Sequence, residues 1–301
     1  MRASAALVAE LGADGSTRLA VQRSQAPLIL RRTPEAVYLV GGAAGPLGGD
    51  VLELQIEVRE GATLRLRTAA AAVALPGRDG RESVLSVTLT VAAGARLEYL
   101  PEPTVAAAGA RHRTDIRADL AAGAALVLRD EAVLGRYGEP GGSCRTRLRA
   151  DLAGAPLLRH DLDVSGTDEV SLGPAVLAGC RTAGSLLWVA PDGLTAGQLP
   201  SGCAAGVAVM PLAGPAVLVT ALAEDARTLR QRLRLPDRPR LPAMGSVPGG
   251  SGSGALVGDR PEGHVGGPDG LPHDALGGIG RRDHAVTAFV NADVVHVAIG
   301  T

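Results

Sequence analysis

The first candidate for chemistry is a glycine-rich loop, "GGAAGPLGGD" at 41–50, which ends in the carboxylate of Asp50. A phosphate-binding loop needs a Lys-Ser/Thr pair after its last glycine, and this chain has no lysine. A dinucleotide-binding loop runs into a helix, whereas "VLELQIEV" at 51–58 alternates like a half-buried strand. The loop therefore joins two strands and is not a nucleotide site. Asp50 is either a transient metal ligand or the residue that shapes the turn by accepting N–H bonds.

Cysteine and histidine spacing gives no preformed site. Cys144, Cys180 and Cys203 form no C-x-x-C pair, which favours small buried thiols in a reducing compartment. No two histidines are three or four residues apart, and no G-x-S-x-G motif is present. The sequence therefore predicts no enzyme activity.

Composition restricts the partners. A net charge of −1 and 2% aromatic residues argue against a nucleic-acid partner. The apolar stretch before Glu10 is too short for a signal peptide, and no run of residues is long enough to span a membrane. We therefore expect a cytoplasmic protein with no membrane partner.

A repeated Gly-Ala pair predicts the elements that hold these residues. The pairs begin at Gly61, Gly94, Gly123 and, more weakly, Gly154, at intervals of 33, 29 and 31 residues. Each pair separates two apolar runs, as a short turn separates a strand from its return strand. One unit cannot bury its own apolar face, so stacked units are needed. The sequence thus predicts a mainly β, layered or solenoid-like fold of hairpin repeats.

One helix and one boundary are expected near the end of this region. Leu222, Leu229 and Leu233 recur at helical spacing, which predicts a helix from about Ala221 to Arg234 with Thr220 as its N-cap. We place a β-rich domain at 1–235. Residues 236–301 form a Pro/Gly/Ser-rich linker and tail that we expect to be largely disordered.

Three segments carry a family resemblance: the loop at 41–50, "ARLEYLPEPTV" at 95–105 and "DEAVLGRYGEPG" at 130–141. In order and spacing they resemble the UreD (UreH) urease accessory proteins, from about Leu19 to Leu235. One departure is "RTAAAAVALPG" at 67–77, where the family often has Thr-Thr-Gln and this chain keeps only Thr68.

The resemblance implies a scaffold rather than an enzyme. Proteins of this family bind urease apoprotein and, with UreF and the GTPase UreG, help deliver nickel to the urease active site. A β-rich body would carry an internal water-filled passage. No cofactor is expected to be tightly bound, and nickel(II) would be in transit.

Six carboxylates are candidates for that path, and each also fits a solvated surface: Asp50, Glu98, Glu102, Asp130, Glu131 and Glu139. Glu98 should face away from Leu97 and Tyr99, where it needs water or a partner if buried. Four residues are expected to shape the loops: Gly48, Gly49, Gly135 and Arg136, the last through a bidentate pair with a carboxylate. The alternative function is a non-catalytic β-sandwich that binds a small molecule or carbohydrate, although scarce aromatic residues argue against sugar binding.

Overall fold

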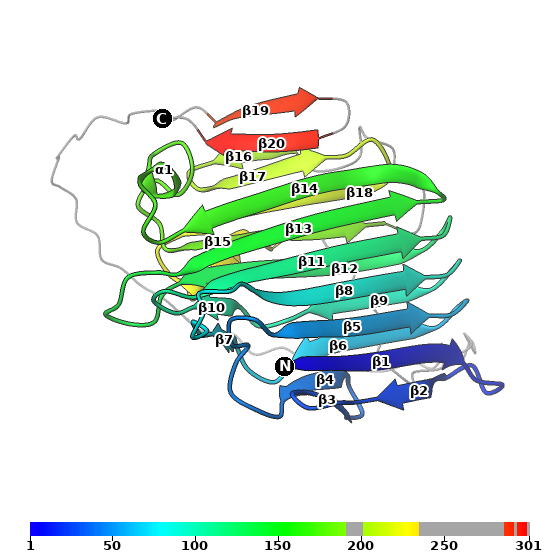
Figure 1. The fold of residues 1–301 in the computed structure, drawn as a ribbon. Helices are drawn as coiled ribbons and strands as arrows, with labels where there is room; N and C mark the ends of the chain where they lie inside the picture. Colours follow the sequence, from blue (N-terminus) through cyan, green and yellow to red (C-terminus); the bar gives the residue numbers. More distant parts are fainter. Residues whose placement is uncertain (191–200, 235–285, 292–293, 300–301) are drawn as a thin grey trace, which may run out of the picture.

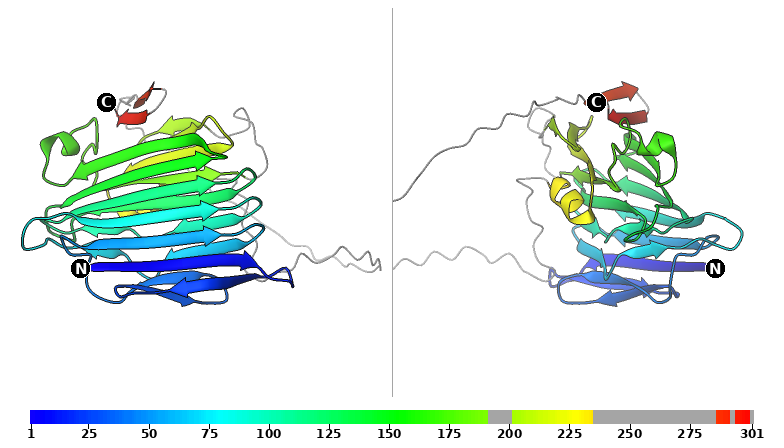
Figure 2. Two further views of the ribbon diagram at one scale, coloured as in Figure 1. Left: turned by 45° about the vertical axis from the view of Figure 1, so that its right-hand side comes forward. Right: turned by 90° about the vertical axis from the view of Figure 1, so that its left-hand side faces the viewer.

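A computed structural model describes residues 1–190, 201–234, 286–291 and 294–299. The chain winds between two sheets that face each other, and consecutive coils stack along one direction (Figures 1 and 2). The prediction of a mainly β, solenoid-like fold is confirmed.

Sheet A has nine strands and contains the outgoing strand of each coil. In spatial order it consists of β19 (Val286–Asn291), β20 (Val294–Ile299), β14 (Ala155–Ser165), β13 (Ser143–Leu152), β11 (Arg111–Leu120), β8 (Ser83–Val91), β5 (Val51–Val58), β1 (Arg2–Leu11) and β2 (Thr17–Arg23).

Sheet B has eleven strands and contains the return strands. Its main path is β16 (Gly202–Ala204), β17 (Val207–Pro211), β18 (Ala216–Ala223), β15 (Thr182–Val189), β12 (Ala125–Leu134), β9 (Arg96–Leu100), β6 (Thr63–Thr68), β4 (Val37–Gly41) and β3 (Leu28–Arg32). Beside this path, β10 (Thr104–Ala106) pairs with β12 and with β7 (Ala72–Ala74).

Each Gly-Ala pair lies at a turn, as the sequence predicts: the pairs at Gly61, Gly94 and Gly123 lead from sheet A to sheet B, and the pair at Gly154 joins β13 to β14 within sheet A. Gly61, Gly94 and Gly123 all have φ between +65° and +74°, a left-handed conformation that glycine adopts without a steric penalty. The alanine that follows each of them is buried, so each turn closes the end of the core. Strand, turn and return strand therefore repeat, and the strands of successive coils are parallel within sheet A and within sheet B.

Alternating residues fill the space between the sheets. Leu54, Ile56 and Val58 of β5 face the core, while Glu53 and Gln55 are on the outer face. Leu97 and Leu126 of sheet B meet them from the other side. This apolar layer is the main core and supplies most of the driving force for folding.

The longer loops gather at the end of the strands opposite the Gly-Ala turns, which we call the loop end. It consists of the segments 42–50, 75–82, 107–110, 135–142 and 166–181. Adjacent loops touch through backbone: Gly48 N donates to Leu75 O at 3.0 Å, and Gly142 N donates to Ala106 O at 3.0 Å. The loops thus form a continuous row across the coils, on the left in Figure 1.

The helices are α1 (Glu169–Leu172) and α2 (Ala226–Arg232). The sequence-based start of the second helix is wrong: residues up to Ala223 belong to β18, and Asp225, not Thr220, is the N-cap. The run "AVLVTALA" is apolar on both faces, because α2 folds back over the outer face of sheet B and buries it. Leu229 and Leu233 pack there, whereas Leu222 is in the strand.

The predicted boundary near 235 falls at the end of a described segment. Most of the 236–301 segment, including 236–285, is outside the residues that the structure describes. Its strands β19 and β20 are placed beside β14 at the edge of sheet A, with His160 opposite Val295. The expectation that the whole tail is largely disordered stays a prediction.

Candidate functional site

A cavity of about 480 Å³ lies between the sheets at the loop end. Its wall includes the small residues 43–46 of the glycine-rich loop and 69–72 of the adjacent segment. The segment that departs from the family motif therefore lines the cavity with alanines. Polar groups are contributed by Tyr99, Glu102, His112 and Asp130, among others.

His112 projects inward from β11 and is held by two hydroxyls. One ring nitrogen, Nδ1, is 2.9 Å from Ser83 Oγ, and the other, Nε2, is 3.2 Å from Thr114 Oγ1. Burial lowers the pKa of His112 to about 4, so the ring is neutral at physiological pH. The Ser83–His112 pair resembles part of a catalytic triad, but the third group here is a hydroxyl and not a carboxylate.

Asp130 links the two sheets. Its Oδ2 accepts a hydrogen bond of 2.7 Å from Thr146 Oγ1, which comes from β13 of the opposite sheet. Burial raises the pKa of Asp130 despite this hydrogen bond. Burial and the charge of Asp130 together raise the pKa of Tyr99, which lies on the same wall. The cavity therefore contains a carboxyl group whose charged form is disfavoured by burial.

Polar residues continue from Asp130 across the interior. In sheet B, Asp130 is opposite Ser185, and Ser185 is opposite Thr220. In sheet A, Thr114 is opposite Thr146. All of these residues fall on the inward face by alternation, so a polar row crosses an otherwise apolar core.

Asp50 is at the end of the glycine-rich loop but is not part of the cavity wall. Its Oδ2 accepts from Leu47 N at 2.9 Å, and its Oδ1 forms an ion pair with the amino group of Met1. Gly48 and Gly49 complete the loop, and Gly48 packs so tightly against Gly77 that a Cβ atom would lie 2.4 Å from its nitrogen. These contacts match the turn-shaping alternative for Asp50, and its role in metal transfer stays a prediction.

Glu98 and Glu131 are on the outer face of sheet B, not in the cavity. The alternation predicted for Glu98 is correct, and this buried carboxylate pairs with Arg67. Glu131 accepts from Arg230 of α2, whose Nη2 is 2.7 Å from Oε2. The same guanidinium binds Glu102, with Nη1 3.0 Å from Oε1. Glu102 therefore lines the cavity while it is tied to a helix on the outside.

Glu139 is in the loop 135–142 and is not part of the cavity wall. It accepts from Arg136 through both oxygens, at 2.8 and 2.9 Å, which confirms the predicted bidentate pair. These bonds lower the pKa of Glu139 to about 2. Gly135 has a φ of +83° and begins the loop. This carboxylate shapes its loop, and the structure does not bring it to the other candidates.

Of the six predicted carboxylates, the structure brings Glu102 and Asp130 to the cavity. Sequence reasoning missed His112, Tyr99 and Thr146. The signal for His112 was the alternation of "RHRTDIRADL" at 111–120, which puts His112 on the same face as Ile116.

No group of three His, Cys, Asp or Glu side chains suited to a metal ion occurs among the described residues. Within the same residues, no helix is long and apolar enough to cross a membrane.

The described residues thus form a stacked β body with a cavity between its two sheets, and the polar lining of this cavity includes Glu102, His112 and Asp130. The family model described as "UreD urease accessory protein" matches residues 1–237. The chain is 45% identical over 274 residues to a urease accessory protein UreD of Frankia alni, covering 77% of this chain and 91% of that protein. Similar proteins occur in Parafrankia (45% identity, 77% and 86% covered) and in Streptomyces griseus (UreD 3; 46%, 77% and 94%).

The chain belongs to the UreD urease accessory protein family. It is therefore an accessory protein of urease maturation and not a catalytic enzyme. This membership decides against the alternative of a β-sandwich that binds a small molecule or carbohydrate.

Proposed function

We propose that this chain is a cytoplasmic scaffold that binds urease apoprotein and, with UreF and UreG, helps insert nickel into the urease active site. Nickel(II) is its cargo and not a resident cofactor. The proposal is supported by family membership and, above all, by the cavity that contains Asp130 and His112.

The side chains of this cavity suit a borderline dication. Neutral imidazole and carboxylate are both good ligands for nickel(II). Because His112 is already neutral, it needs to lose no proton before it binds a metal ion. Hydroxyls and waters would complete the coordination along the polar row of Thr146, Ser185 and Thr220. A few ligands at a time hold an ion weakly enough to release it, as a passage requires.

Asp130 would couple the ion to a proton. Burial favours the protonated carboxyl group, whereas an adjacent dication favours the carboxylate. Nickel would therefore favour the carboxylate form of Asp130 while it is bound, and burial would favour proton binding after the ion has left.

The test is the Asp130→Asn substitution. The amide oxygen still accepts from Thr146, so the variant should fold and bind urease apoprotein normally. We expect urease matured with this variant to contain at least about tenfold less nickel, measured by elemental analysis, because the interior carboxylate is lost.

The matched control is Glu53→Gln, an exposed acid on the outer face of sheet A. It removes the same charge and should leave nickel loading unchanged. If the Asp130→Asn variant loads urease fully, the cavity is not the nickel route and this proposal fails.

A further inference from the structure

Exposed apolar side chains concentrate at the loop end. Six large hydrophobic side chains are exposed among the described residues, and five are at this end of the strands. Leu47, Tyr137, Val170 and Leu172 are in the loops themselves, and Met1 adjoins them because its amino group pairs with Asp50. The sixth, Leu11, is at the opposite end of the strands. Single exposed apolar residues are ordinary, but a group at one end marks an interaction surface.

Tyr137 is the most prominent of them, with a relative exposure of 106%. This chain has three tyrosines, one tryptophan and one phenylalanine, so a fully exposed ring is unusual here. Tyrosine is among the residues that most often dominate binding energy at protein interfaces.

The loop that carries Tyr137 is held rigid on both sides. Arg136 and Glu139 form their bidentate pair directly across the tip. From the segment before β15, Arg181 Nη2 donates to the carbonyl oxygens of Leu134 at 2.9 Å and Glu139 at 2.8 Å. A ring presented by a fixed loop loses little conformational freedom on binding, which favours affinity.

The other exposed residues fit the same footprint. Val170 and Leu172 are on α1, in the next loop of the row, where Gly166 N donates to Gly142 O at 2.9 Å. From β5 to β14 there are four steps between neighbouring strands of sheet A, or about 19 Å at the usual spacing. That span fits within one standard protein interface of about 800 Å² per partner. Figure 2, right, looks onto this end.

The charge next to Tyr137 is paired within its own loop. Arg136 pairs with Glu139, and elsewhere at the loop end Arg81 is 3.2 Å from Asp79. Tyrosine is enriched at the centres of protein interfaces, where unpaired charges are disfavoured. The exposed ring of Tyr137 therefore has no uncompensated charge directly beside it in the loop.

We infer that the loop end is the docking surface for urease apoprotein, with Tyr137 as its anchor. The inference rests on the proposed function, because the choice of urease over another protein follows from the cavity. Loops of this end line the cavity, so a protein seated here would cover the cargo route and receive the ion without its release to water. The fitting partner surface is an uncharged pocket that accepts a tyrosine ring.

The experiment measures binding of the full chain to immobilised urease apoprotein. Tyr137→Ser should weaken the Kd at least about tenfold. Val170→Ser with Leu172→Ser should weaken it less, by about threefold to tenfold. The matched control, Leu11→Ser, changes a residue of 48% exposure at the other end and should change the Kd by less than twofold. The melting temperatures should be equal, because these side chains are exposed.

Separate outcomes test the inference and the proposal beneath it. Wild-type chain that fails to bind urease apoprotein would overturn the proposed function and the inference with it. Wild-type binding that Tyr137→Ser leaves intact overturns the inference alone. The inference alone also fails if this variant loses only UreF binding, or only dissociates a dimer of the chain in size-exclusion chromatography.

Discussion

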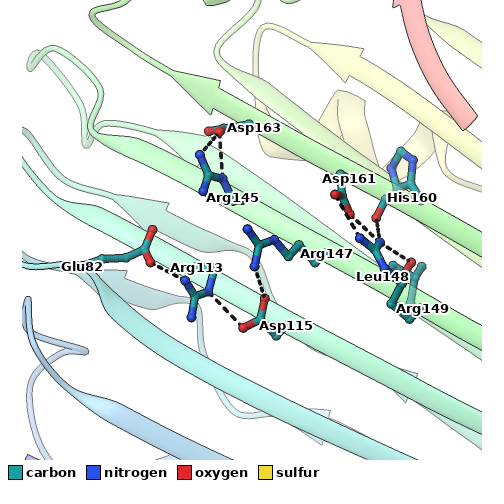
Figure 3. Close-up of polar contacts among 10 residues, drawn as sticks. All are labelled: Glu82, Arg113, Asp115, Arg145, Arg147, Leu148, Arg149, His160, Asp161 and Asp163. Carbon is teal, nitrogen blue, oxygen red and sulfur yellow. Dashed lines mark hydrogen bonds and ion pairs between the residues drawn. The ribbon is translucent and has the colours of Figure 1, made fainter. Parts of the chain in front are cut away.

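The outer faces of the two sheets contain the same pairing, arginine with carboxylate, at different depths. On sheet A the exposed ion network joins β11, β13 and β14 (Figure 3): Glu82, Arg113, Asp115, Arg147, Arg145, Asp163, Arg149 and Asp161. On sheet B the covered ion network lies beside α2: Arg67, Glu98, Glu102, Arg129, Glu131 and Arg230. The Glu131 side chain is 0% exposed, and that of Asp161 is 41% exposed.

The difference in depth should decide what each network does. Solvent screens the exposed pairs, so each adds little to stability and the face tolerates change. In the covered network the side chains of Glu98 and Glu131 are 7% and 0% exposed, so these two carboxylates have lost water and the arginines compensate that loss. The covered network also connects α2 to Glu102 at the cavity, so its geometry matters beyond stability.

The largest expected effect is from Glu131→Ala. It removes a fully buried carboxylate that binds Arg230 and is 3.3 Å from Arg129, so both cations lose a partner. We expect the free energy of unfolding to fall by about 3–5 kcal/mol in urea denaturation. A loss below about 1 kcal/mol would mean that the two networks are equivalent and would break the comparison.

The pH dependence of stability tests the burial of His112, a titratable side chain that has no ionic partner in its two hydrogen bonds. Burial lowers the pKa of His112 to about 4, below its ordinary value near 6.5. As pH falls from 6.5 to 4, His112 binds a proton in the unfolded chain but stays neutral in the folded chain. The free energy of unfolding therefore declines over this window. The difference amounts to about 3 kcal/mol at pH 4.

A variant isolates this contribution from that of other titrating groups. We expect the stability of His112→Gln to depend less steeply on pH than the wild type between pH 6.5 and 4. His160, whose pKa burial also lowers to about 4, remains in both proteins and cancels in the difference. Parallel pH profiles would show that His112 is not buried as a neutral ring.

Local features of this fold could be predicted from the sequence, whereas contacts between distant segments could not. The Gly-Ala period predicted the turns because a left-handed glycine and a buried alanine are local requirements. Alternation placed Glu98 opposite Leu97 and Tyr99. Whether an outward residue meets water or an ion partner depends on distant segments, as with Glu131, which binds a helix 99 residues later. For the same reason, the sequence could not single out Glu102 and Asp130 as the carboxylates of the cavity.

The Arg230→Met variant sharpens the link between the covered network and the cavity. It retains much of the apolar stem but removes the donors to Glu131 and Glu102, so we expect a loss of about 2 kcal/mol. It should also change nickel loading of urease, because Glu102 is no longer held. The control is Arg232→Met on the same helix, whose guanidinium donates to the Leu222 carbonyl. An equal effect of both variants on nickel loading would mean that α2 matters only through its packing.

The smallest expected effect is on the exposed face. Asp161→Asn removes the charge that Arg149 meets through Nη2 at 3.0 Å, in a pair open to solvent. Because water replaces the lost contact, the free energy of unfolding should change by less than about 1 kcal/mol. The remaining difference should shrink further in 1 M NaCl, since screening acts on exposed charges. The Glu131→Ala effect should persist in the same salt, because no ions reach that carboxylate. Comparison of both variants in low and high salt therefore tests burial directly: equal salt dependence would show that depth does not distinguish the two faces.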